Sequence, residues 1–141
     1  MHYGIKISKL ENGKFEVSCR DFPDYRSEHD SEAEARSFAE SFVPKLMMDE
    51  YRHKKKAIPL PSEVSESDVL YYIPAKVQAK ILLWNFMVTH GLKIADVARR
   101  LGVQHSEAAR LVDLTKDIAS IDAVEAALMK LGASFTLQIK E

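Results

Sequence analysis

One stretch of the chain, Ile94 to Leu111, restricts its fold more than any other. It contains two short helical patterns on either side of Gly102, a residue that tolerates the left-handed backbone of a sharp turn. Two helices that cross over such a turn need a small residue where they touch and apolar residues at the other contacts. This packing set is Val97, Ala98, Leu101, Gly102, Val103, Ala108 and Leu111. The pattern therefore predicts a helix-turn-helix.

The second helix of this motif keeps a polar outward face. Side chains of this kind can reach base edges and phosphates in the major groove of DNA. Glu107 is unfavourable beside phosphates, although a carboxylate can accept a hydrogen bond from cytosine N4. The alternative is a helical hairpin that serves packing alone. The predicted DNA contacts are Lys93, Arg99, Arg100, Gln104, His105, Ser106, Glu107 and Arg110.

Charge is divided unevenly between the two halves of the chain. Met1 to Leu70 contains 11 Lys+Arg and 14 Asp+Glu, a net charge of −3, whereas Tyr71 to Glu141 contains 9 and 7, a net charge of +2. These counts reproduce the totals of 20 and 21 for the whole sequence. Such a separation suggests two surfaces with two kinds of partner. Chance fluctuation over small counts is the alternative.

The first half has the alternation of strands followed by the periodicity of a helix. Met1 to Leu10 and Phe15 to Cys19 alternate apolar and polar residues around the turn-forming Asn12-Gly13, which predicts a β-hairpin. A short third strand is expected at Tyr25 to His29, and a last one at Val69 to Ile73. The predicted order is β-β-β-α-β.

The helix of this first half should begin at Ser31. Its hydroxyl can cap the helix, and Glu34 stands three residues later, where its carboxylate can return to the backbone N–H of the cap as a capping box. Pro44 lacks a backbone donor, so we expect it to kink or shorten the helix.

The second half is mainly helical and ends in an alternating segment. Ala75 to Thr89 is apolar almost all round, which indicates burial in a core or against another subunit. A helix is expected from Ile121 to Leu131, followed by a strand from Phe135 to Ile139. An isolated strand must find another edge, either in a second subunit or on the chain's own first domain. The predicted dimer interface comprises Trp84, Phe135, Leu137 and Ile139.

Several short motifs, taken in order and spacing, make the sequence resemble the HicB antitoxin family in its helix-turn-helix form. Besides the hairpin and the helix-turn-helix, they are Asp21-Phe22-Pro23, Ser31-Glu32-Ala33-Glu34-Ala35, Ile58-Pro59-Leu60-Pro61-Ser62, Ile73-Pro74, Ile121-Asp122-Ala123-Val124 and Leu131-Gly132. The resemblance covers nearly the whole chain. Family members usually have glycine where this sequence has Asp24.

The resemblance implies an α+β protein with two domains. Residues 1–73 would be a partial ribonuclease-H-like, toxin-neutralising domain that covers the active site of a HicA-type mRNA interferase toxin. Residues 74–141 would be a helical helix-turn-helix domain, ending in a short strand, that binds operator DNA and represses the operon as a homo-dimer or higher oligomer. The alternative is a ligand-responsive helix-turn-helix repressor without a toxin partner.

Composition and residue placement argue against other classes. The first and last predicted strands contain no carboxylate, whereas ribonuclease-H chemistry needs clustered acids that hold two metal ions, so we expect no enzyme and no catalytic residues. The five histidines lack zinc-ligand spacing, and no metal or cofactor is expected. Cys19 is the only cysteine and no apolar run approaches the roughly 18 residues of a membrane helix. A cytoplasmic protein is predicted.

Overall fold

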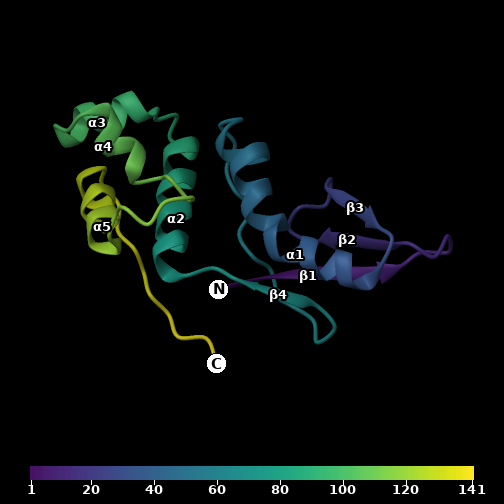
Figure 1. The fold of residues 1–141 in the computed structure, drawn as a ribbon. Coiled ribbons are helices and arrows are strands. Elements are labelled where there is room, and N and C mark those ends of the chain that lie inside the picture. Colours follow the sequence, from purple (N-terminus) through teal and green to yellow (C-terminus); the bar gives the residue numbers. More distant parts are fainter. The chain divides into compact units, whose positions relative to one another are not determined.

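The computed structural model describes residues 1–141 and separates them into two units, Met1–Pro74 and Ala75–Glu141. The first unit contains β1 (His2–Lys9), β2 (Phe15–Cys19), β3 (Arg26–His29), α1 (Glu32–Leu46), the π-helical segment η1 (Met47–Arg52) and β4 (Val69–Tyr72). The second contains α2 (Ala75–Thr89), α3 (Ile94–Leu101), α4 (His105–Arg110) and α5 (Ile121–Lys130) (Figure 1). The chain thus combines a four-stranded antiparallel sheet with five α-helices.

The sheet of the first unit follows from the alternation in the sequence. Its strand order is β3-β2-β1-β4, and every neighbouring pair is antiparallel. Gly13 adopts a φ of 82° in the turn between β1 and β2, which confirms the predicted hairpin. Tyr3, Ile5 and Val17 are fully buried on the face that carries the core. The other two predicted strands are confirmed as β3 and β4.

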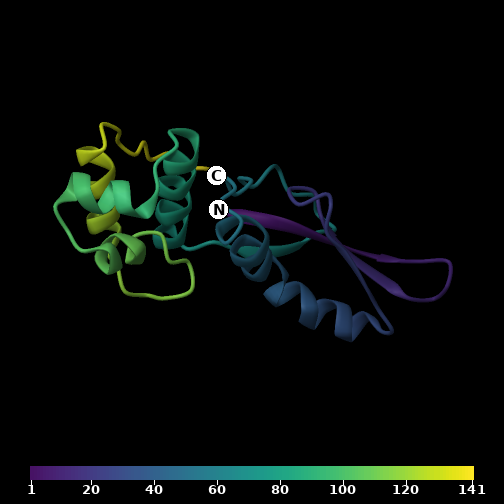
Figure 2. The same cartoon turned by 90° about the horizontal axis from the view of Figure 1, so that it is seen from above.

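Helix α1 covers one face of this sheet (Figures 1 and 2). Ala35, Ala39 and Phe42 are buried against the strands. The Ser31 hydroxyl accepts a hydrogen bond from the backbone N–H of Glu34 at 3.2 Å, as predicted for the cap. The return half of the capping box is different, because the Glu34 carboxylate accepts from the N–H of Asp30 at 3.3 Å rather than from that of Ser31. The reciprocal bond is therefore shifted by one residue.

Pro44 does not end the helical run. It lies inside α1, which ends two residues later at Leu46, and the chain continues through η1 with five-residue spacing, as in the hydrogen bond from His53 N–H to the Met48 carbonyl at 2.8 Å. A proline removes one backbone donor and crowds the preceding turn. The α-helical part is short after Pro44, as expected, and wider π-helical bonding in η1 keeps the following residues helical.

The turn after β2 is joined to the proline-containing loop before β4. The Asp21 carboxylate accepts from the backbone N–H of Ser62 at 3.1 and 3.2 Å, and the Tyr3 hydroxyl donates to the Pro59 carbonyl at 2.5 Å. Phe22 is fully buried and its ring lies 5.4 Å from that of Tyr3. Two of the motifs noted in the sequence, at residues 21–23 and 58–62, therefore meet in space.

Side chains of the loop before β4 lie close over Gly4 of β1, and this contact provides a first prediction. A Cβ at this position would overlap Oδ2 of Asp68 and lie 3.2 Å from Cγ1 of Val64. The Asp68 side chain is 2% exposed and is held by the N–H of Ser65 and by Arg20, so it cannot withdraw freely. We expect Gly4→Ala to lower the free energy of unfolding by about 2 kcal/mol.

Urea denaturation of the full chain measures this effect. Ser8→Ala is the matched control, because Ser8 belongs to the same strand and lines the same face, and we expect it to change stability by no more than about 0.5 kcal/mol. Equal stability of the two variants would show that Asp68 moves aside at little cost.

The second unit is built around α2. Ile81, Leu83 and Met87 are buried and Trp84 is 4% exposed, so these residues belong to the core of the chain. The remaining large apolar side chains of α2 are half-buried, namely Val77, Leu82, Phe86 and Val88. Ser120 caps α5, since its hydroxyl accepts from the N–H of Ala123 at 3.1 Å. None of the helices is both long enough and apolar enough to cross a bilayer.

The predicted strand from Phe135 to Ile139 is not formed in the single chain. Residues 133–141 contain no strand, and the side chains of Leu137 and Ile139 are 88% and 93% exposed. A strand requires a neighbouring edge for its backbone hydrogen bonds, and the second unit has no sheet to provide one. The alternation is present in the sequence, but its pairing partner is absent from the single chain.

Candidate nucleic-acid interface

The start of α3 is fixed by its own side chains. The backbone N–H of Lys93 donates to Oδ2 of Asp96 at 2.8 Å, and Arg99 forms an ion pair with the same carboxylate. That backbone hydrogen bond, together with the nearby cations, holds the pKa of Asp96 below its ordinary value. Asp96 therefore stays ionised and anchors the first turn of α3.

The turn between α3 and α4 closes as a Schellman motif. Gly102 has φ 69° and ψ 34°, its N–H donates to the Arg99 carbonyl at 3.3 Å, and the N–H of Val103 donates to the Ala98 carbonyl at 3.0 Å. This pair of bonds satisfies the last carbonyls of α3 and requires a left-handed residue after the helix. Gly102 consequently turns the chain sharply into α4.

Packing residues around the turn divide into two groups. Val97, Ala98 and Ala108 are 1%, 7% and 1% exposed, so the predicted contact between the helices is closed by small side chains. The other three apolar members are only half-buried, and they line a groove of about 270 Å³ that continues onto α5. The groove is lined by Leu101, Val103, Glu107, Leu111, Ala123, Ala126, Ala127 and Lys130.

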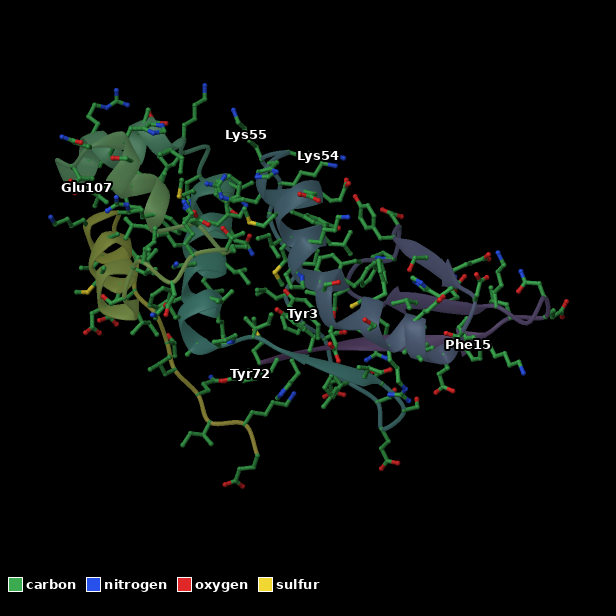
Figure 3. The ribbon with its side chains drawn as sticks, viewed as in Figure 1. Tyr3, Phe15, Lys54, Lys55, Tyr72 and Glu107 are labelled. Carbon is green, nitrogen blue, oxygen red and sulfur yellow. The ribbon has the colours of Figure 1, made fainter.

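The outward face of this motif is polar and predominantly cationic. All the predicted DNA contacts are exposed, namely Lys93, Arg99, Arg100, Gln104, His105, Ser106, Glu107 and Arg110. Arg99 is paired with Asp96, whereas Arg100 and Arg110 form no ion pair. Glu107, which is labelled in Figure 3, also lines the groove described above. Two unpaired guanidinium groups on adjacent helices are available to phosphates or base edges.

The residues predicted for the dimer interface differ in how much of their side chains is exposed. Trp84 lies in the core of the single chain and offers almost no surface to a partner. Leu137 and Ile139 are nearly fully exposed, and Phe135 is half-buried. Of the residues predicted for the dimer interface, those of the C-terminal segment are therefore accessible and Trp84 is not.

Sequence reasoning missed one buried charged residue. Lys80 on α2 is 1% exposed, and its ammonium group donates to the carbonyls of Asp113 at 2.9 Å and Lys116 at 2.8 Å. The available signal was that Lys80 directly precedes the apolar run Ile81 to Trp84, because a charge placed among core residues needs buried partners. No group of three or more His, Cys, Asp or Glu side chains is placed to hold a metal ion.

Comparison with known proteins places the chain in a family. Residues 2–82 match the family model described as the HicB-like antitoxin of bacterial toxin-antitoxin systems. The chain belongs to the HicB-like antitoxin family. Antitoxin HicB of Pseudomonas fluorescens (strain Pf0-1) is 32% identical over 139 residues, which is 98% of this chain and 93% of the relative. Antitoxin HicB of Escherichia coli (strain K12) is 30% identical over 137 residues, covering 97% and 98% of the two chains.

A third relative, Antitoxin HicB 2 of Photorhabdus laumondii subsp. laumondii, is 32% identical over 137 residues, 97% of this chain and 95% of the relative. The HicB-like match thus identifies an antitoxin of a toxin-antitoxin system, and its relatives are antitoxins rather than enzymes. The family model ends at residue 82, before α3 begins. The role of the α3–α4 motif therefore has to be argued from its geometry.

Proposed function

We propose that this HicB-like antitoxin has two activities, one in each domain. Residues 1–73 bind and inhibit a HicA-type mRNA interferase toxin, and residues 74–141 bind operator DNA and repress the toxin-antitoxin operon. The observation that carries the proposal is the Schellman turn at Gly102 joined to an exposed cationic face, in a chain that belongs to an antitoxin family. The division of the chain after Pro74 supports the two-domain assignment.

For DNA binding, we assign α3, the turn at Gly102 and α4 as a helix-turn-helix. In such a motif the second helix enters the major groove with its first residues at the base edges. Gln104, His105 and Ser106 precede or open α4 and would read bases, while Arg110 and Arg100 would bind phosphates or guanine. Arg99 would have to exchange its bond with Asp96 for a phosphate.

For toxin binding, we assign the first domain as a partial ribonuclease-H-like fold. Four antiparallel strands with α1 on one face support this assignment. Its net charge of −3 over residues 1–70 suits a cationic, RNA-binding partner. Neutralisation would then be steric, since covering the toxin's active site excludes RNA.

Operator binding also calls for two copies of the chain. Helix-turn-helix proteins read two half-sites about one helical turn apart, which requires a dimer. The alternating segment Phe135 to Ile139 would pair with the same segment of a second copy, so that each provides the edge that the other lacks. Leu137 and Ile139 would be buried in that contact.

Co-expression tests the toxin partner directly. The small basic protein encoded beside this gene is produced with the full chain, and capture together with relief of growth arrest is the expected result. Absence of capture by the full chain would contradict the antitoxin activity and favour a ligand-responsive repressor without a toxin partner.

Arg110→Ala tests the DNA-binding face. We expect operator affinity to fall by about 1–3 kcal/mol, roughly 5- to 150-fold, if Arg110 contacts a guanine. Toxin capture should be unchanged, because α4 belongs to the other domain. Fluorescence anisotropy with operator DNA measures the first effect, and Arg36→Ala, an exposed arginine on α1, is the matched control. Loss of both activities together would instead indicate unfolding or a shared surface.

A further inference from the structure

The exposed large apolar side chains of the first unit are concentrated in one segment. Leu60, Val64, Leu70 and Tyr72 are 48%, 41%, 50% and 57% exposed, and no other large apolar residue of this unit is comparably exposed. All four lie between residues 60 and 72, in the loop before β4 and in β4 itself. Apolar surface gathered in this way, rather than scattered singly, marks an interaction site.

Val64, Leu70 and Tyr72 lie next to one another on the face of the sheet opposite α1. Tyr72 pairs with His2 across the β1–β4 ladder and Leu70 pairs with Gly4, while the next residue of β1, Tyr3, is fully buried on the other face. Figure 3 labels Tyr3 and Tyr72 on these opposite sides.

Two side-chain contacts complete the surface. Val64 lies over Gly4, since a Cβ there would be 3.2 Å from its Cγ1. The ring of His2 lies 5.2 Å from that of Tyr72. We call the surface formed by His2, Val64, Leu70 and Tyr72 the β4 patch.

The loop that leads into β4 gives the β4 patch an acidic border, whereas Lys6 and Arg20 are cations on the same face of the neighbouring strands. Residues 57–75 contain Glu63, Glu66 and Asp68 but no lysine or arginine. Arg20, which borders this segment, is already paired with Asp68 at 3.0 Å, and the Asp68 carboxylate is 2% exposed. Hydrogen bonds from Ser65 and Arg20 outweigh the effect of burial and hold the pKa of Asp68 below its ordinary value. Glu63 and Glu66 remain exposed without an ion pair, and they give the patch an acidic rim.

We propose that the β4 patch is the surface on which the toxin docks, with an apolar contact at its centre and cationic toxin side chains at its rim. The inference rests on the proposed function, and it assigns a location to it. A toxin that cleaves RNA needs a cationic surface for the phosphate backbone. An acidic rim would attract that same surface, so the antitoxin would occupy the place of the RNA.

The same charges argue against a second copy of the chain as the occupant. Two β4 patches brought face to face would place Glu63 and Glu66 of both copies near one another, and like charges across an interface are costly. A basic partner turns these carboxylates into attractive contacts. The toxin therefore fits the patch better than self-association does.

Binding of the full chain to a catalytically inactive variant of the neighbouring toxin tests this location. The double substitution Leu70→Lys with Tyr72→Lys replaces two exposed apolar side chains at the centre, and we expect affinity for the toxin to fall by about 100-fold or more. Operator affinity should be unchanged. Glu40→Lys, on the exposed side of α1, is the control that alters charge on the opposite face and should bind the toxin like the parent chain.

A second variant changes only the loop before β4. A loss of toxin binding by this variant cannot be attributed to misfolding of β4. Glu63→Lys with Glu66→Lys should weaken toxin binding by about 10-fold and reduce its dependence on salt, because attractive rim charges become repulsive. The single backbone contact from Arg20 to the Glu63 carbonyl does not involve the replaced side chain.

Each outcome separates the location from the function. If the parent chain binds the toxin and both double variants bind equally well, the β4 patch is not the docking surface, although the antitoxin activity stands. If the parent chain does not bind the toxin, the proposed function itself fails. If the variants change the oligomeric state measured by light scattering but leave toxin affinity unaltered, the patch contacts a second copy and the proposal is overturned.

Discussion

Lys80→Met is expected to lower the free energy of unfolding of the second unit by about 2 kcal/mol. The Lys80 ammonium ties the segment between α4 and α5 to α2 through the carbonyls of Asp113 and Lys116. Methionine retains the apolar stem but leaves both carbonyls without their donor. Burial lowers the pKa of Lys80, so part of this loss is offset when the buried charge is removed. We expect the two lost hydrogen bonds to outweigh that gain.

Urea denaturation followed by tryptophan fluorescence measures the change, because Trp84 is the only tryptophan and lies on α2. Lys76→Met is the matched control. Lys76 stands one turn earlier on the same helix and pairs with Asp117, whose side chain is 83% exposed, so its removal should cost less than about 1 kcal/mol. Equal effects of the two substitutions would mean that water replaces the Lys80 ammonium at both carbonyls.

The strands and helices of the first unit could be predicted because their signals are local. Alternation across Asn12-Gly13 specifies a hairpin, and the hydroxyl of Ser31 specifies where α1 begins. In the second unit the same holds for Gly102, whose left-handed backbone is needed wherever a helix ends in a Schellman turn. Features determined by neighbouring residues are visible in the order of those residues.

Features that depend on distant residues could not be predicted in this way. The burial of Lys80 depends on carbonyls more than thirty positions away, and the contact of Asp21 with Ser62 spans a separation of 41 residues. The exposure of Leu70 and Tyr72 depends on which face of the sheet α1 covers. The apolar segment Ala75 to Thr89 was compatible with a core or with an interface, and only the packed structure assigns Trp84 to the core.

Phe135→Asp is expected to convert the proposed dimer into a monomer and to weaken operator binding by about 100-fold or more. A charged side chain at the start of the alternating segment would have to be buried in the contact between copies, where an unpaired carboxylate is costly. With the dimer lost, each chain would bind one half-site alone, and the gain from simultaneous binding of two half-sites would disappear. Sedimentation velocity measures the association state, and anisotropy with operator DNA measures the affinity.

Thr136→Asp is the control for this experiment. Thr136 is the next residue along, so in a paired strand it points to the opposite face from Phe135, Leu137 and Ile139. If Phe135→Asp dissociates the dimer and Thr136→Asp does not, the segment is paired as a strand in the dimer. Phe135→Asp with an intact dimer would exclude this segment as the interface. The apolar side chains of Leu137 and Ile139 would then need a different partner.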